Sequence, residues 1–361
     1  MTKNIRFAVL AQVAAACVGL FATTLPAAAQ SCSCPADVTA DGSINVNDML
    51  AVINGWGPGA TGPADINDDG QVNVNDLLAV INGWGQSCTV PGVFPADWIS
   101  GCPSCGSCGD PSIQVHQYNA DTYILRQSKC TNFEAPFMYL LFGQNKVLLQ
   151  DTGASNVPVA GTVYGIIQQW LTAHGQASIQ LIVTHSHGHG DHVFADSQFA
   201  GQPNTTTVGT SQTAVRNFFG ITTWPTQIVQ YDLGGGRVLD VIPIPGHQSA
   251  HIALYDRKTG ILFTGDTLYP GHLFISAWSD YKASIQRLVT FTQDKPVCHV
   301  LGTHIEMTST PSVAYPYGTV YQPNEHVLQL TRDHLVELNN ACIQMGNTPH
   351  YEVHNSFIIF P

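Results

Sequence analysis

Hydrophobic and polar positions follow two different patterns along the chain. Between residues 31 and 88, short apolar segments alternate with turns rich in Asp, Asn and Gly. From about residue 112, apolar runs of strand length alternate with stretches of helical period. Residues 137–142 and 146–150 predict a hairpin turning at Gly143, residues 163–174 predict a helix ending at Gly175, and residues 179–183 predict a short buried strand. This alternation predicts an α/β domain over residues 112–361.

The first residues have the pattern of a secretory signal. Lys3 and Arg6 precede an apolar run at 7–20, and three alanines at 27–29 provide small residues for a signal peptidase. We therefore expect residues 1–29 to be a signal peptide and the protein to be exported, to a periplasmic, cell-surface or extracellular location. No later segment has the roughly eighteen consecutive apolar residues of a membrane span.

Composition narrows the class of protein. The chain is 44% hydrophobic and 11% charged, which suits a globular core rather than disorder. Its formal net charge of −12 makes nucleic acid an unsuitable partner. Of the ten cysteines, Cys17 lies in the predicted signal, and the remaining odd number leaves one thiol free or intermolecular if the others form disulfides.

Two acidic loops repeat each other 28 residues apart, the first beginning at Asp37 and the second at Asp65. Each has oxygen-bearing side chains at positions 1, 3, 5, 9 and 12 and Gly at position 6, the spacing with which an EF-hand-like loop surrounds one Ca²⁺. No Lys, Arg or His lies between Ser31 and Cys88 to neutralise the aspartates. We therefore expect two bound Ca²⁺ ions, held by Asp37, Thr39, Asp41, Asn45 and Asp48 and by Asp65, Asn67, Asp69, Asn73 and Asp76.

The repeated pair resembles the dockerin family, whose duplicated loop–helix units also carry Asp at position 12. The resemblance covers about residues 35–86 and implies a small α-helical, EF-hand-like module over 31–88, with helices ending at Gly55 and Gly83. It also implies a cohesin-like or cell-surface protein partner. In that family, loop positions 10 and 11 contact the partner, and here they are Val-Asn in both copies rather than the Ser/Thr pairs of familiar examples. The partner's identity therefore does not carry over.

Residues 89–111 are rich in Pro, Gly, Ser and Cys and predict an exposed linker. Cys102, Cys105 and Cys108 are spaced as metal ligands can be, but no fourth ligand is near, so disulfides are the expected use in an exported protein. Their pairing stays open. Cys88 can bond to either of the two cysteines at 32 and 34 and so close the module.

A histidine-rich run follows the strand predicted at 179–183. Four histidines and one aspartate crowd into residues 185–192, where imidazoles would repel one another if protonated and would leave unsatisfied nitrogens if neutral. A metal ion resolves both problems, since imidazole and carboxylate are good zinc ligands. Read from His187, the run matches the His-x-His-x-Asp-His signature of the metallo-β-lactamase superfamily, which the chain resembles. His185 is then an extra histidine with a structural or supporting role.

The resemblance extends along the domain, because residues matching the rest of the family's ligand set follow in order, each after a strand-like segment. It implies an αββα sandwich of two β-sheets packed face to face with helices outside. After His247 the family's Thr-Pro-Gly-His becomes Gln-Ser-Ala-His at 248–251, which alters that turn, and His299 is read as incidental. The ligand sets that the resemblance implies are His187, His189 and His247 for one zinc ion and Asp191, His192 and His304 for a second, with Asp266 bridging them.

These residues imply a dinuclear zinc hydrolase acting on a small molecule. A hydroxide bridging the two ions would attack an ester, thioester, lactone or lactam, and Asp191 would orient it and relay its proton. The enzyme would be hydroxyacylglutathione hydrolase-like, lactonase-like or β-lactamase-like. Two alternatives stay open: a mononuclear iron persulfide or sulfur dioxygenase on the same fold, and a non-catalytic binding protein. An aromatic stretch at 315–321 follows His304 and either lines the pocket or packs as an ordinary loop.

Overall fold

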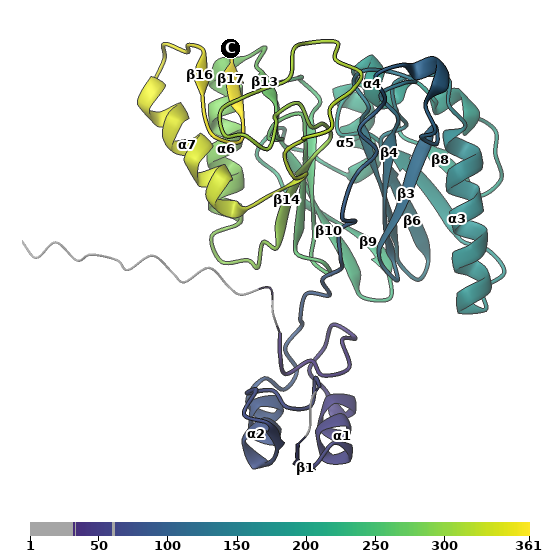
Figure 1. Ribbon diagram of the computed structural model, residues 1–361, viewed down its shortest axis with the longest axis vertical. Helices are drawn as coiled ribbons and strands as arrows, with labels where there is room; N and C mark the ends of the chain where they lie inside the picture. Colours follow the sequence, from purple (N-terminus) through teal and green to yellow (C-terminus); the bar gives the residue numbers. More distant parts are fainter. Residues whose placement is uncertain (1–31, 33, 60–61) are drawn as a thin grey trace, which may run out of the picture.

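The computed structural model describes residues 32, 34–59 and 62–361. The predicted signal peptide, residues 1–29, lies outside the described residues. A small helical module stands at one end of a larger α/β domain (Figure 1). Across the described part of the chain, no helix is long and apolar enough to cross a membrane.

The module contains two helices, as the sequence predicts. Helices α1 (Val46–Asn54) and α2 (Val74–Asn82) each follow one acidic loop and end at a glycine, and strands β1 (Gly57–Pro58) and β2 (Gln71–Val72) pair between them. Each helix begins with a capping box, in which an Asn caps the first turn and an Asp three residues later accepts a hydrogen bond from the Asn backbone. A small core holds the helices together and consists of Ile44, Val52, Val72, Val80 and Cys88.

The α/β domain contains two six-stranded sheets packed face to face, which confirms the predicted sandwich. The first sheet has the order β3-β4-β5-β6-β7-β8, with bounds Ile113–Asn119, Thr122–Gln127, Phe137–Phe142, Lys146–Gln150, Gln180–Thr184 and Thr205–Thr207. The second sheet has the order β15-β14-β12-β11-β10-β9, with bounds Gln329–Leu330, His299–Gly302, Ile261–Gly265, Ile252–Asp256, Arg237–Pro243 and Val229–Gly234. Side chains alternate between the two faces of each strand, so alternate residues meet in the core between the sheets. That core includes Tyr139, Leu141, Leu148, Val241, Leu254 and Phe263.

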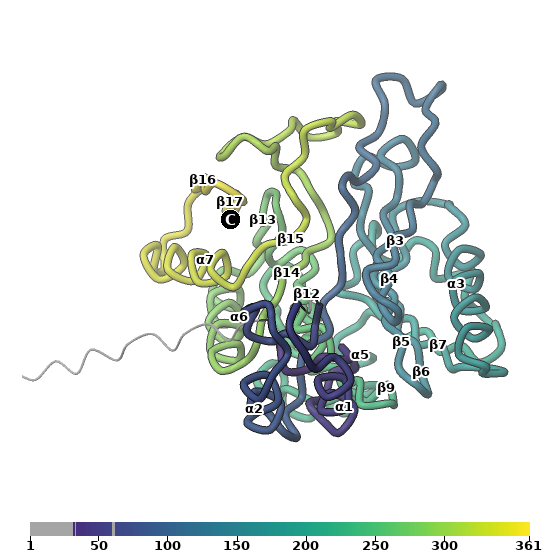
Figure 2. The backbone as a smooth tube through the Cα atoms, turned by 60° about the horizontal axis from the view of Figure 1, so that its bottom comes forward, coloured from purple at the N-terminus to yellow at the C-terminus, as the bar shows by residue number. Residues whose placement is uncertain are grey.

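Helices cover both outer faces (Figure 2). Helix α3 (Val159–His174) packs on the first sheet, and α6 (Trp278–Phe291) and α7 (Arg332–Met345) pack on the second. Helix α3 ends at Gly175 in the left-handed conformation, as expected, but begins before residue 163 because Val159 and Ala160 are also buried in the core. The remaining helical segments are short: α4 (Gly190–Val193), α5 (Gln212–Phe219), η1 (Cys105–Ser107) and η2 (Asp196–Gln198).

A third, three-stranded sheet lies beside the second half of the domain. Strand β17 (Ile358–Phe360), near the C-terminus, pairs in parallel with β13 (His272–Phe274) and antiparallel with β16 (Glu352–Val353). The pairing of β13 with β17 brings the end of the chain next to the segment that follows Asp266. It therefore shapes the surroundings of the predicted metal ligands.

The first part of the predicted linker lies against the α/β domain. The Val90 amide donates to the carbonyl of Lys258 at 2.6 Å, and the Val93 amide donates to the carbonyl of Tyr118 at 2.9 Å. Trp98 packs edge-on against Phe137, with 5.0 Å between ring centroids. The turn around η1 is exposed, as predicted. The module is thus joined to the domain by a segment that is itself bound to the sheets.

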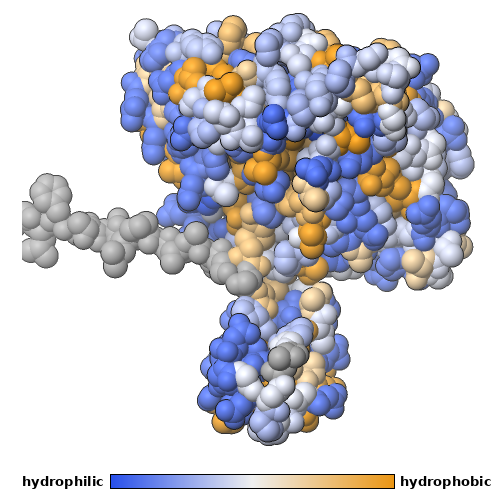
Figure 3. Space-filling view, in the orientation of Figure 1, coloured by the Kyte–Doolittle hydropathy of each residue, from blue (hydrophilic) through white to orange (hydrophobic). Residues whose placement is uncertain are grey.

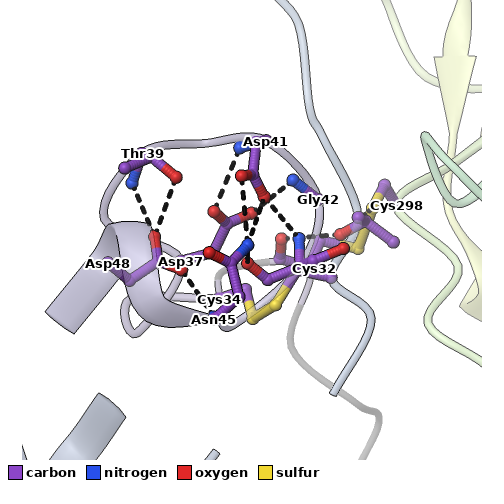
Figure 4. The surroundings of a disulfide bond; sticks show 12 residues. Cys32, Cys34, Asp37, Thr39, Asp41, Gly42, Asn45, Asp48 and Cys298 are labelled. Atoms are coloured by element: carbon purple, nitrogen blue, oxygen red, sulfur yellow. Dashed lines mark hydrogen bonds between the residues drawn. A yellow bond between two sulfur atoms is a disulfide. The ribbon is translucent and has the colours of Figure 1, made fainter. Parts of the chain in front are cut away.

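Four disulfides lock this arrangement. Cys34–Cys88 closes the module, which confirms one of the two predicted pairings, and Cys32–Cys298 ties the module to the residue before β14 (Figure 4). The linker cysteines form disulfides as expected, in the pairs Cys102–Cys108 and Cys105–Cys130. Among the described residues the free thiol is Cys342, which is buried in α7.

Candidate metal centre

The predicted zinc ligands gather at one end of the sandwich, where strands β7, β10, β12 and β14 finish. Strand β7 leads to His187 and His189, and α4 then presents Asp191 and His192. His247, Asp266 and His304 follow β10, β12 and β14 in the same way. Strands β10, β12 and β14 run in the same direction within the second sheet, so their carboxyl ends meet at this edge, where β7 of the first sheet also ends.

Three histidines form the first group of ligand atoms. His187 Nε2 lies 2.9 Å from His189 Nδ1, and His247 Nε2 lies 3.1 Å and 3.0 Å from these two atoms. His247 Nδ1 is 2.7 Å from the carbonyl oxygen of Phe274, which only accepts, so Nδ1 carries the proton and Nε2 presents a lone pair to the group. Three converging ring nitrogens form one face of a tetrahedral zinc site.

The second group contains two histidines and two aspartates. Asp191 Oδ2 lies 3.1 Å from His192 Nε2 and 3.3 Å from His304 Nε2. Asp266 lies between the two groups: its Oδ2 is 3.4 Å from His192 Nε2 and 3.5 Å from His247 Nε2, while its Oδ1 is 3.4 Å from His304 Nε2. Within each group the ligand atoms lie within 4.8 Å of one another.

The buried nitrogens show that these residues fit a metal ion. His192 Nε2 is buried and has no hydrogen-bond partner in the protein. The other nitrogen of each second-group histidine is occupied, because His304 Nδ1 donates to the carbonyl of Glu134 at 2.9 Å and His192 Nδ1 donates to Asp151 at 3.1 Å. The free Nε2 lone pairs therefore face the carboxylate oxygens. Lone pairs and carboxylates repel one another unless a cation lies between them.

The electrostatics of the cluster point the same way. Burial holds the pKa of His187 well below its ordinary value, and the neighbouring His192 lowers it further. Burial also disfavours a charged His192, yet the carboxylates of Asp266, Asp151 and Asp191 outweigh it and raise that pKa well above the ordinary value. The centre thus contains a dense set of carboxylates that favours positive charge among them.

Asp151 directly follows the strand predicted at 146–150, and the structure gives it a role that the sequence analysis did not assign. It is fully buried and accepts hydrogen bonds from the Ser186 amide at 2.7 Å and from His192 Nδ1 at 3.1 Å. Strands β6 and β7 pair in parallel, with Gln150 opposite Thr184, so Asp151 must lie beside the start of the histidine run. An acidic residue at the end of the adjacent parallel strand was the signal that could have identified it.

Among the histidines outside the two groups are the three that the sequence analysis noted. His185 Nε2 is 2.8 Å from Asp196 Oδ1, which fits the supporting role expected for it. His299 packs edge-on against Phe94 at 5.0 Å and takes no part in the centre. His251, from the altered turn, is fully buried and stacks on His187 with 4.6 Å between ring centroids. His251 thus packs behind His187 and adds no ligand atom to the first group.

The two acidic loops of the module have matching hydrogen bonds. In the first, Asp37 accepts from the amides of Asp41 and Gly42 at 3.0 and 2.8 Å, and Asp48 accepts from the Thr39 amide and hydroxyl, both at 2.9 Å (Figure 4). In the second loop, the corresponding acceptors are Asp65 and Asp76. Asn45 and Asn73 cap the two helices. The remaining ligand candidates Asp41, Asn67 and Asp69 are exposed. Burial raises the pKa of Asp37, and the carboxylates of Asp48 and Asp41 add to the effect. The loops therefore hold acidic groups close together without a basic neighbour.

A third cluster of ligand-type side chains, Cys102, Cys108 and Asp110, is explained without a metal. Both sulfur atoms are joined to each other in a disulfide and have no thiolate to offer.

Known protein families match both the α/β domain and the N-terminal module. Residues 132–304 match the metallo-beta-lactamase superfamily, and residues 35–84 match the dockerin type I domain. An acyl-coenzyme A thioesterase, MBLAC2, of Gallus gallus is 40% identical over 77 residues, covering 20% of this chain and 28% of that protein. A hydroxyacylglutathione hydrolase of Synechococcus sp. (strain CC9902) is 27% identical over 168 residues, covering 43% of this chain and 64% of that protein. A metallo-beta-lactamase from Pontibacter korlensis, a solved structure, is 19% identical with a TM-score of 0.43, covering 64% of this chain and 99% of that chain.

The α/β domain therefore belongs to the metallo-beta-lactamase superfamily, and the N-terminal module is a dockerin type I domain. The chain spans less than two thirds of the length of the curated relatives named above. The substrates in those relatives' names are the substrates of those proteins.

Proposed function

We propose that this protein is an exported zinc hydrolase that cleaves an ester, thioester, lactone or lactam. The observation that supports it is the convergence of seven side chains from four strand ends into two adjoining groups that share Asp266. In this proposal one zinc ion is held by the three-histidine group and a second by the group that contains Asp191. Two bound zinc ions would polarise a carbonyl oxygen and lower the pKa of a shared water.

The protein's own residues would orient the reacting groups. Asp191 is the more accessible of the two carboxylates, with 23% of its side chain exposed against 9% for Asp266. Its position beside His192 and His304 lets it orient a nucleophilic water and take up the proton that the water loses. Asp266 is buried and accepts a hydrogen bond from the Thr303 hydroxyl, so it serves as a fixed ligand between the two groups.

Thioesters are favoured within this substrate range. One relative is named as an acyl-coenzyme A thioesterase and several others as hydroxyacylglutathione hydrolases. Part of the wall beside the metal groups, formed by residues 306–322 and strand β17, lies outside the matched region 132–304, so the substrate of this protein need not be that of its relatives.

We also propose that the dockerin module binds two Ca²⁺ ions and docks on a cohesin-like protein. Each helix, together with the Trp two residues after it, presents an apolar stripe that is about half exposed, formed by Val46, Leu50, Ile53 and Trp56 in one copy and by Val74, Leu78, Ile81 and Trp84 in the other. Such contiguous apolar surface favours a protein partner. The module stands at the opposite end of the molecule from α4, so a docked partner would leave the metal centre open (Figures 1 and 3).

A substrate screen with two matched variants tests the hydrolase proposal. The zinc-loaded protein is assayed on thioesters, lactones, nitrocefin and phosphoesters. On any carbonyl substrate that is cleaved, Asp191→Asn should lower kcat by a factor of about 10² or more, because both the orienting acceptor and a ligand are weakened. Asp196→Asn removes the same charge beside the non-ligand His185 and should leave kcat within about threefold. Equal rates for the two variants would contradict the role given to Asp191.

A further inference from the structure

A large cavity adjoins the metal centre on the side of the C-terminal strands. Its volume is about 600 Å³, within the range of about 300–1,000 Å³ typical of small-molecule sites. Three parts of the chain line it: the loop at 129–134, the segment at 306–322, and strands β13 and β17 with Tyr351. The aromatic stretch at 315–321, left open by the sequence, thus contributes to the wall of this cavity.

Two residues of the cavity wall touch the ligand set directly. The carbonyl of Glu134 accepts the hydrogen bond from His304 Nδ1, and the carbonyl of Phe274 accepts the one from His247 Nδ1. Those histidines belong to different groups of the centre. A substrate whose scissile carbonyl lies between the groups would therefore have the cavity within reach of its adjoining part.

The wall is mainly apolar and aromatic. Phe274 and Phe360 pack together with 5.0 Å between ring centroids, Tyr351 lies 5.9 Å from Phe360, and Phe133 lies 4.8 Å from Tyr317. Phe274 and Phe360 keep about 40% of their surface exposed, so the packed pair presents a contiguous apolar surface of the kind that lines ligand-binding grooves. Figure 3 shows apolar atoms at this end of the molecule, near the C-terminal strands.

The basic groups of the wall each lie beside an acidic side chain. Glu306 accepts hydrogen bonds from both the amide and the ring Nδ1 of His272, at 2.7 and 2.8 Å. The ammonium of Lys129 lies 3.7 Å from Glu325, which Arg126 also holds. No free cation is thus left among these groups for an anionic ligand, which favours a neutral occupant.

We propose that this cavity receives the acyl group of the substrate, and that the group is apolar and bulky, such as a medium-chain or arylalkyl acyl group. The inference rests on the proposed hydrolase function and specifies its substrate: an ester or thioester with such an acyl group.

A series of thioesters with one constant leaving group tests it on the zinc-loaded full chain. Acetyl, hexanoyl, decanoyl and phenylacetyl thioesters of N-acetylcysteamine are compared by kcat/KM. Each buried methylene should raise kcat/KM about fourfold, so hexanoyl should exceed acetyl by a factor on the order of 100. A second series keeps the acetyl group and lengthens the thiol.

Variants of the wall show whether this cavity provides the selectivity. Ala314→Trp fills the cavity and Phe360→Ala removes part of its wall, and each should lower the hexanoyl-to-acetyl ratio at least about fivefold. Ile343→Ala removes an exposed apolar side chain on α7, away from the cavity, and should keep the ratio. The two wall variants change volume in opposite directions, and circular dichroism shows which of them fold.

The outcomes separate the two proposals. Equal kcat/KM for acetyl and hexanoyl thioesters, or a preference that follows the thiol instead of the acyl group, would overturn the inference and leave the hydrolase proposal intact. A lack of turnover across both series and all other carbonyl substrates would contradict the hydrolase proposal, and the inference would fall with it.

Discussion

Asp151 sets the tautomer of His192, a predicted metal ligand, without being a ligand itself. Its carboxylate only accepts hydrogen bonds, so the proton of His192 must stand on Nδ1 and the lone pair on Nε2, toward Asp191 and Asp266. Its backbone has a φ of +71°, a conformation that Asp and Asn adopt more readily than most residues. A substitution to Asn would therefore preserve the backbone while changing the hydrogen-bond chemistry.

We predict that Asp151→Asn weakens zinc binding about 10- to 100-fold, because an amide NH₂ facing Nδ1 favours the wrong tautomer. Titration against a chelating dye measures this affinity. Asp196→Asn serves as the control, since it makes the same change beside His185, and it should bind zinc as the unaltered chain does. Equal affinities for all three proteins would show that Asp151 does not position His192.

Lys129 is a second residue whose surroundings lead to a measurable prediction, through its pKa. It is buried, and burial lowers its pKa to about 8, against an ordinary value of 10.5, although Glu325 partly offsets the effect. Arg126 binds both oxygens of Glu325, so the carboxylate is shared between two cations. Glu306 and Glu134 are the other acidic groups that act on the Lys129 ammonium.

This shift predicts a pH-dependent stability. Between pH 8 and about 10.5 the unfolded chain binds a proton at Lys129 that the folded chain has lost, so the free energy of unfolding should rise with pH relative to a Lys129→Met variant. The full difference is about 3 kcal/mol. Urea unfolding of both proteins from pH 7 to pH 10.5 measures it, with Lys295→Met as a control outside the cluster. A pH-independent difference between the unaltered chain and Lys129→Met would rule out the lowered pKa.

At the level of elements, each acidic loop and the helix after it share one side chain. Asp48 and Asp76 stand at loop position 12 and at the third position of their helices, where they accept from the loop and from the helix cap. Loop and helix are thereby coupled, so an ion held by the loop also orders the helix. Position 4 of the loops is different, because it is Ala40 in one copy and Asp68 in the other, and both have positive φ.

We predict that calcium raises the melting temperature of the module in the full chain, and that Asp65→Asn removes the contribution of one ion. Asp68→Asn makes the same charge change at the position that the other copy fills with Ala, and Asn tolerates its backbone conformation. Differential scanning calorimetry with calcium and with a chelator compares the three proteins. If Asp68→Asn reduces the calcium effect as much as Asp65→Asn, the assignment of ligands by loop position is wrong.

The elements that the sequence predicts are those whose signal is local. The hairpin at Gly143, the helix stop at Gly175 and the two loop–helix units each follow from residues a few positions apart. The strand ends that bring the metal ligands together follow from the order of His187, His247 and His304 along the family pattern. The pairing of β13 with β17 has no local signal, because it joins segments about 85 residues apart. The cavity wall therefore had to come from the structure, as did the role of Asp151 and the packing of residues 90–98.

At the scale of the whole molecule, the dockerin module is attached to the domain at more than one point. Besides the chain itself, Cys32–Cys298 joins the first described residue to the residue before β14, and the Thr89 hydroxyl donates to the Cys32 carbonyl at 3.0 Å. Val90 is bonded to Lys258 on the turn between β11 and β12. These contacts hold the module at the end of the sandwich away from α4 (Figure 1).

We predict that replacing Cys32 and Cys298 by Ser loosens the module without affecting the metal centre. Limited proteolysis should cut the double variant near residues 86–91 several-fold faster than the unaltered chain, while its zinc content stays the same. The matched control replaces Cys102 and Cys108, whose disulfide spans a sequence separation of 6 and does not connect the module to the domain. Similar cleavage rates for the unaltered chain and both double variants would show that Cys32–Cys298 does not restrain the module.

Two metal ions held by the seven converging residues are the basis of the proposed hydrolysis. Elemental analysis of the purified full chain, measured together with protein concentration, tests this directly. It should find two zinc ions per chain, and a His247→Ala variant should hold fewer, whereas His299→Ala should still hold two. One iron per chain, or no transition metal bound by a folded protein, would contradict the dinuclear zinc centre.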